Sequence, residues 1–166
     1  LFPYTTLFRS SLYSEKWHNW ADLRQEEGEG RWQAGAWCHG FGGIAAARLA
    51  CLPYVDGKLK EVMEEDLRLA EHGFLALRRR KGMCLCHGNM GMLLLLERYG
   101  KTFPSEQLAL VKNALSGAAL EELEKGRLMP QEKYARGLMS GMSGIGYACL
   151  KLAGFTTLPD ILVCGI

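Results

Sequence analysis

The sequence predicts an all-α fold in which inner and outer helices alternate. The frame Cys-His-Gly-x-x-Gly occurs at 38–43 and 86–91, and a degenerate copy that keeps both glycines follows at 139–144. A short apolar segment follows each copy, and a longer segment with helical spacing follows the first two. Runs with strand alternation are absent from the sequence. Two helices in each repeat of about fifty residues are typical of a solenoid or a closed ring.

The short segments after the frames are predicted to be inner helices. They span residues 44–52, 92–99 and 145–152 and contain many alanines and leucines but few charges. Most of their surface should therefore be buried. The glycines of each frame allow the preceding loop to turn sharply and to approach its neighbours closely. We expect these loops to form one face, since each lies at the same end of an inner helix.

Two longer segments are predicted to be outer helices. Residues 59–77 place apolar side chains at roughly helical spacing with glutamates between them, and residues 105–124 repeat the pattern. Pro104 and Ser105 supply a start for the second segment, and Gly126 supplies a stop.

Composition limits the classes of protein that the chain can represent. Its 166 residues are 48% apolar and 23% charged, as in an ordinary globular domain or a large part of one. A formal net charge of +2 gives no electrostatic case for nucleic acid or for an anionic membrane. No run approaches the roughly 18 apolar residues that a membrane span needs. The six cysteines and the lack of a signal-peptide pattern predict a reducing, cytoplasmic location.

Residues 1–11 stand apart from this pattern. They show neither helical period nor strand alternation, so we expect a segment that is foreign to the fold or disordered. The domain itself is expected to occupy residues 12–166.

Two Cys-His pairs are the strongest functional signal. Cysteine and neutral histidine are preferred zinc ligands, and the repeat of Cys38-His39 as Cys86-His87 suggests that two neighbouring repeats converge on one metal ion. All four side chains could form a closed, structural Cys2His2 site. Alternatively, three could bind zinc and leave the fourth position open for substrate, which is the catalytic arrangement. A third interpretation is that no metal binds and the cysteines are small buried residues.

Three further residues near the pairs have expected roles. Cys84, two residues before a proposed ligand, should pack in the core. Trp37 should wall the metal cleft or pack beneath it. Arg31 precedes the first frame and is a candidate to reach the site.

The frames resemble the last three glycine motifs of lanthionine synthetase C-like proteins. The matching segments are Ala-Trp-Cys-His-Gly at 36–40, Leu-Cys-His-Gly at 85–88, and residues 137–146. Leu-Pro-Asp-Ile-Leu at 158–162 is similar to the C-terminal end of the bifunctional, class II enzymes. The resemblance covers about residues 12–166.

This resemblance implies a partial α/α toroid of about three helix pairs around a zinc ion. It implies that Cys38, Cys86 and His87 bind the metal and that His39 beside it is a catalytic acid/base. The implied reaction is Michael-type addition of a peptide cysteine thiol to dehydroalanine or dehydrobutyrine, as in lantibiotic biosynthesis. The implied partner is a dehydrated precursor peptide with cysteines, and a dehydratase domain is expected in the full-length chain.

The chain has fewer helix pairs than the family's full ring. We therefore expect the C-terminal part of a cyclase domain, which could be incomplete as a catalyst. Three alternatives stay open. They are a eukaryotic-type relative that binds or transfers glutathione-like thiols, a non-enzymatic helical scaffold with structural zinc, and a catalytically inactive piece.

Overall fold

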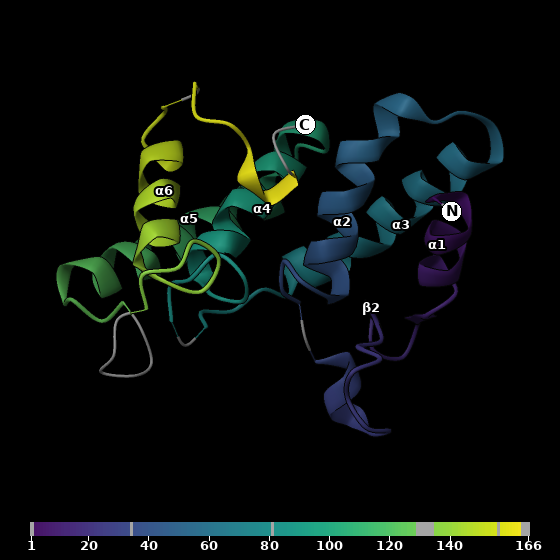
Figure 1. The fold of residues 1–166 in the computed structure, drawn as a ribbon, viewed down its shortest axis with the longest axis horizontal. Helices are drawn as coiled ribbons and strands as arrows, with labels where there is room; N and C mark the ends of the chain where they lie inside the picture. The colour runs from purple at the N-terminus through teal and green to yellow at the C-terminus, as the bar shows by residue number, and fades with distance from the viewer. Residues whose placement is uncertain (1, 34, 81, 129–134, 156, 164–166) are drawn as a thin grey trace. The chain divides into compact units, whose positions relative to one another are not determined.

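The computed structural model describes residues 2–33, 35–80, 82–128, 135–155 and 157–163 (Figure 1). The chain divides into two compact units, Leu1–Ala76 and Leu77–Ile166, and the position of one relative to the other is not determined. The described residues form six α-helices and one two-stranded hairpin, which confirms the predicted all-α class. None of the described helices combines the length and the apolarity needed to cross a membrane.

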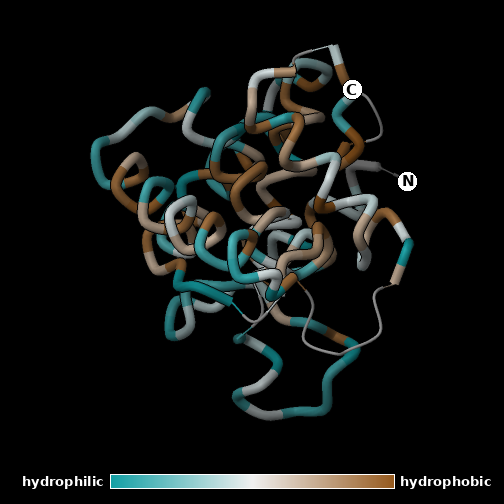
Figure 2. The backbone as a smooth tube through the Cα atoms, turned by 90° about the vertical axis from the view of Figure 1, so that its left-hand side faces the viewer, coloured by the Kyte–Doolittle hydropathy of each residue, from teal (hydrophilic) through white to brown (hydrophobic). Residues whose placement is uncertain are grey.

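The elements of the first unit are α1 (Phe2–Ser10), β1 (Tyr13–Ser14), β2 (Asn19–Trp20), η1 (Glu29–Trp32), α2 (Gly40–Cys51), η2 (Leu52–Tyr54) and α3 (Gly57–Leu75). Those of the second are α4 (Asn89–Thr102), α5 (Glu106–Glu124), α6 (Met142–Leu152) and η3 (Ile161–Val163). The strands pair antiparallel, with Tyr13 opposite Trp20. In Figure 2 the helices have most of the hydrophobic colour, whereas the loop that contains η1, at the bottom of both views, is hydrophilic.

The first unit is built on the packing of α2 against α3. The apolar stripe predicted for the outer helix is buried, since Met63, Leu67 and Phe74 have no exposed surface. Phe41 of α2 meets Phe74 edge to face, with ring centroids 5.2 Å apart. Burial of aromatic and aliphatic side chains of this size is the main favourable contribution to such a core.

Helix α1 occupies the segment that was expected to lack regular structure. Thr6 is buried, and the Ser10 hydroxyl donates to Oδ2 of Asp66 in α3 at 2.6 Å. Arg48 of α2 donates to the same carboxylate oxygen at 2.7 Å and to the Thr6 carbonyl at 3.3 Å. A buried ion pair thus joins α1 to α2 and α3, a contact that local periodicity does not reveal. That residues 1–11 are foreign to the fold stays a prediction.

In the second unit, α4 packs on α5 and α6. The start predicted for the second outer helix is confirmed, because the Ser105 hydroxyl caps α5 by accepting a hydrogen bond from the Leu108 amide at 3.2 Å. Gly126 follows the helix with φ +67°, the left-handed conformation that commonly ends helices.

The three frames share one backbone geometry. A Cβ added to Gly43 would lie 2.5 Å from the carbonyl oxygen of the residue six positions earlier. The corresponding distances are 1.7 Å at Gly91 and 1.8 Å at Gly144. The first turn of each inner helix therefore touches the backbone of the loop that precedes it, and only glycine leaves room. The inner helices accordingly begin three or four residues before their predicted starts, since apolar spacing does not reveal a first turn that contains glycine.

Candidate functional site

The first Cys-His pair lies where the loop of the first frame enters α2. Cys38 is exposed, and its Sγ is 3.0 Å from Nδ1 of His39. His39 is the N-cap residue of α2 and has an extended backbone, with φ −168°. Its carbonyl accepts a hydrogen bond from the Ala36 amide at 2.9 Å, which closes the loop below the pair.

Asp22 and Arg24 approach the same imidazole. The Arg24 guanidinium donates to both carboxylate oxygens of Asp22, from Nε to Oδ1 at 2.8 Å and from Nη2 to Oδ2 at 2.9 Å. The same Nη2 is 2.7 Å from His39 Nδ1. Oδ2 of Asp22 is 3.6 Å from His39 Nε2.

These contacts select one histidine tautomer. A guanidinium can only donate hydrogen bonds, so the Nδ1 atom that faces Arg24 must act as an acceptor. The hydrogen of a neutral ring is then on Nε2, the atom that faces the Asp22 carboxylate.

Asp22 is held in its ionised form. Its side chain is 5% exposed, and the hydrogen bonds from Arg24 lower its pKa to about 2 despite the opposing effect of burial. The same hydrogen bonds, together with one to Cys38, raise the pKa of Arg24. Both groups are therefore charged at neutral pH.

A pocket of about 260 Å³ opens beside this pair. Trp37, Cys38 and His39 contribute to its lining, together with Thr5, Thr6 and Arg9 of α1. The proposed ligand and the proposed acid/base of the first unit are thus reachable from a cavity.

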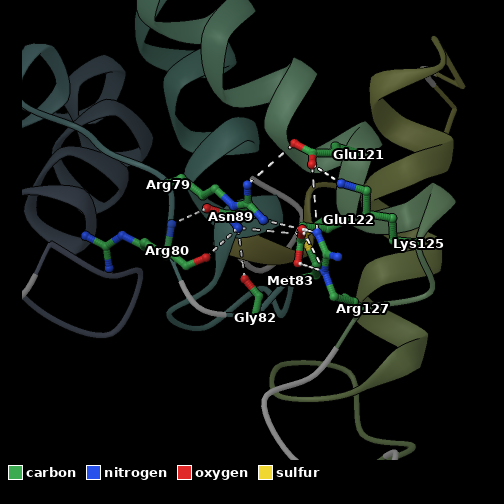
Figure 3. Close-up of polar contacts among 9 residues, drawn as sticks. All are labelled: Arg79, Arg80, Gly82, Met83, Asn89, Glu121, Glu122, Lys125 and Arg127. Carbon is green, nitrogen blue, oxygen red and sulfur yellow. Dashed lines mark hydrogen bonds and ion pairs between the residues drawn. The ribbon is translucent and has the colours of Figure 1, made fainter.

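The second pair lies in the loop before α4, which is fixed by a buried asparagine (Figure 3). The Asn89 side chain accepts from the Arg80 amide at 2.8 Å and donates to the carbonyls of Arg80 and Gly82 at 3.0 and 3.1 Å. Asn89 has no exposed surface, so these bonds replace all of its contact with water. Cys86 is half-buried and His87 is exposed.

The loops of the second and third frames lie side by side. The Cys86 amide donates to the carbonyl of Met139, the first residue of the third frame, at 2.8 Å. Leu85 also packs on Gly144, where an added Cβ would lie 2.9 Å from Leu85 Cγ. The predicted shared face is therefore present for these two loops of the second unit.

The four predicted site residues are divided between the units. Cys38 and His39 belong to the first and Cys86 and His87 to the second. Within the described part of either unit, no group of three His, Cys, Asp or Glu side chains could hold a metal ion. Each pair nevertheless offers a thiol outside any disulfide and an imidazole, the donors that suit zinc, so the ligand set fits the metal chemically. Cys84 is buried, as predicted.

Asp22 and Arg24 are functional candidates that the sequence pattern did not single out. Arg31, a candidate to reach the site, donates to the Gln25 carbonyl at 3.3 Å. Asp22 and Arg24 lie in a polar loop well before the frame, and no spacing rule connects them to His39. An Asp-x-Arg shortly after the buried Trp20 is the available signal, since that burial anchors one end of the loop.

Comparison with known proteins agrees with the motifs. The family model for the lanthionine synthetase C-like protein matches residues 5–163. The lacticin 481/lactococcin biosynthesis protein LcnDR2 of Lactococcus lactis subsp. lactis is 30% identical over 147 residues, covering 80% of this chain. The chain spans 15% of the length of that relative. The chain belongs to the lanthionine synthetase C-like family.

Proposed function

We propose that this chain is the metal-binding, C-terminal part of a cyclase that closes thioether rings in a precursor peptide. The observation that supports it best is the arrangement of Cys38, His39, Asp22 and Arg24 beside a pocket. Family membership and the lantibiotic-biosynthesis relative support the substrate class, a dehydrated peptide that contains cysteines. A dehydratase domain elsewhere in a longer chain would supply that peptide.

Cys38, Cys86 and His87 would hold zinc. When bound, zinc would lower the pKa of a substrate thiol so that it is a thiolate near neutral pH. With two protein thiolates already on the metal, the substrate sulfur would stay electron-rich. Three protein ligands would leave one position open for the substrate, as in catalytic zinc sites.

The addition forms one C–S bond and moves one proton. The substrate sulfur attacks the β-carbon of dehydroalanine or dehydrobutyrine, and the π electrons move toward the α-carbon and its carbonyl. The resulting enolate takes a proton at the α-carbon, and the thiol proton released earlier balances it.

His39 is the residue proposed to deliver this proton. Imidazole suits proton transfer near neutral pH. Asp22 would hold the ring through Nε2, and the transferred proton would leave from Nδ1 once the exposed Arg24 side chain moves aside, because Nδ1 carries a hydrogen only in the protonated ring. A fixed ring allows proton transfer without the cost of reorientation.

The test is metal content together with the absorption of the cobalt-substituted chain, with and without a cysteine-containing peptide. The proposal expects one metal ion in each chain, two sulfur ligands without peptide and a third when peptide is added. A closed site with four protein ligands that peptide does not perturb would indicate structural zinc. A chain that binds no metal would contradict the proposal.

His39→Asn separates the catalytic role from metal binding. The variant should retain zinc and the response to peptide but lose ring closure, measured on dehydrated peptide in the full-length enzyme. Loss of zinc in this variant would instead place His39 among the ligands. Turnover of free glutathione in preference to the peptide would favour the glutathione-type alternative.

A further inference from the structure

The second unit contains a pocket of about 640 Å³ that the proposed chemistry does not use. It lies among α4, α5, α6 and the tail that follows α6, with walls from Leu94, Arg98, Lys112, Tyr147, Lys151 and Leu162, among others. A volume of this size is typical of sites that bind small molecules or peptide side chains.

The tail closes one side of this pocket through defined bonds. Asp160 pairs with Arg98 of α4 at 2.7 Å. The Tyr147 hydroxyl donates to the Pro159 carbonyl at 2.6 Å and accepts from the Ile161 amide at 3.3 Å. In Figure 1 the yellow tail accordingly runs from the end of α6 across to α4. These bonds make the tail a wall of the pocket.

The pocket has more positive than negative charge. Four cationic side chains and two carboxylates line it, which leaves a surplus of two positive charges. Asp160 is matched by Arg98, whereas Glu97 faces both Lys112 at 2.8 Å and Lys101 at 3.3 Å. Lys151 donates to a neutral group, the Leu158 carbonyl, at 2.6 Å. One surplus charge therefore lies near Glu97 and the other near the tail.

Helix-end electrostatics account for part of this charge but not for Lys112. Lys101 and Lys151 lie in the last turns of α4 and α6, where a cation offsets the helix dipole. Lys112 lies in the interior of α5, so the helix dipole does not explain why a cation lies at this side of the pocket. Hydrogen bonds from Lys112 and then Lys101 lower the pKa of Glu97, which keeps this carboxylate ionised.

The pocket also offers apolar surface between the charges. Leu95 and Leu162 are buried beneath it, and Leu152 remains 39% exposed at its edge. A ligand that matches both features has carboxylates separated by apolar side chains. Peptide segments that alternate acidic and aliphatic residues have this chemistry.

We propose that this pocket binds an acidic, apolar segment of a peptide, outside the residues that react. The inference rests on the proposed function only for the statement that the peptide is a substrate. Binding there would hold a long peptide on the second unit while other parts of it reach the metal. Such remote contacts raise the effective concentration of the reacting groups.

The test uses the whole chain and a short fluorescent peptide that alternates glutamate and leucine, without cysteine or dehydrated residues. Fluorescence anisotropy should report saturable binding that weakens as salt increases. The peptide with glutamine in place of glutamate should bind up to about fivefold more weakly for each charge pair that it loses. The peptide with serine in place of leucine should also bind more weakly, because it loses apolar contact with the pocket. Equal binding of the glutamine peptide would overturn the proposal, as would lack of binding by the first peptide.

Two variants and two controls locate the site. Lys112→Gln should weaken binding about two- to fivefold, whereas Lys125→Gln, at a lysine outside the pocket that pairs with Glu121, should not. Leu152→Ala should weaken binding, whereas Leu120→Ala, at an exposed leucine of α5 outside the pocket, should not. Equal effects of variant and control would show non-specific attraction to the surface and contradict the site. Because no step requires metal or ring closure, failure here is distinguishable from failure of the proposed cyclase.

Discussion

Arg24 donates two parallel hydrogen bonds to the Asp22 carboxylate, one from Nε and one from Nη2. The Nη2 atom also lies 2.7 Å from Nδ1 of His39. Arg24 is exposed, whereas Asp22 is buried, and the two hydrogen bonds fix the plane of the guanidinium. The orientation of Arg24 toward His39 therefore depends on Asp22. This pair gives the polar loop before η1 a defined contact with the first Cys-His pair. It also makes the stability of the first unit dependent on pH.

Asp22 should stabilise the folded chain above about pH 4. Its folded pKa of about 2 lies below the ordinary value of 3.8 that it regains on unfolding. The contribution is therefore complete above the unfolded pKa and is lost as pH falls through the folded pKa. Urea midpoints of the wild type and Asp22→Asn should differ most near pH 5 and converge toward pH 2.

Glu26→Gln is the control for this experiment, since Glu26 is an exposed carboxylate of the same loop as Asp22 and lies at no α-helix end. Its difference from the wild type should change little over the same range. A gap for Asp22→Asn that stays constant from pH 5 to pH 2 would contradict the assigned pKa.

If Cys38, Cys86 and His87 hold zinc as proposed, Cys86→Ala should lose it, because the two remaining ligands would bind the metal poorly. Cys84→Ala is a matched variant two residues away, at a buried thiol. It should keep its metal and lose only some stability. The measurement is the zinc content of both variants after dialysis. Stoichiometric zinc in Cys86→Ala would show that Cys86 is not a ligand.

Gly144→Ala should destabilise the second unit. The added Cβ would lie 1.8 Å from the Leu138 carbonyl oxygen, so backbone must move, at a cost of about 1–3 kcal/mol or more. Gly146→Ala, two residues later in α6, meets nothing within 4 Å and should stabilise the helix by up to about 1 kcal/mol. Urea unfolding measures the change in stability of both variants. Changes of the same sign would contradict the close approach between Gly144 and the Leu138 carbonyl.

Arg48→Met should destabilise the first unit by about 3–5 kcal/mol, because it leaves the Asp66 carboxylate buried without its partner. Arg68→Gln breaks an exposed pair with Glu65 in the same helix and should change stability by less than about 0.5 kcal/mol. Loss of the α1 contacts should accompany the first variant, seen as faster amide exchange over residues 4–10. Protection of α1 equal to that of the wild type would show that the ion pair does not hold this helix.

The sequence by itself determined the repeat and its inner and outer helices, α2 to α6, but not α1. Apolar spacing, the cap at Ser105 and the stop at Gly126 are local signals, because each depends on contacts within one or two turns. The frames also predicted the glycine geometry that the third copy keeps after losing Cys and His. The family, and with it the ligand set to be tested, followed from the same short motifs.

Tertiary structure alone decided which distant groups meet. Asp22 and Arg24 reach His39 because the chain between them folds back, and Arg48 holds α1 through Asp66 although these residues share no motif. Likewise, Lys112 and the tail come to one pocket only when α4, α5 and α6 are packed. Such contacts depend on loop closure and on the burial of charge, and sequence spacing reports neither.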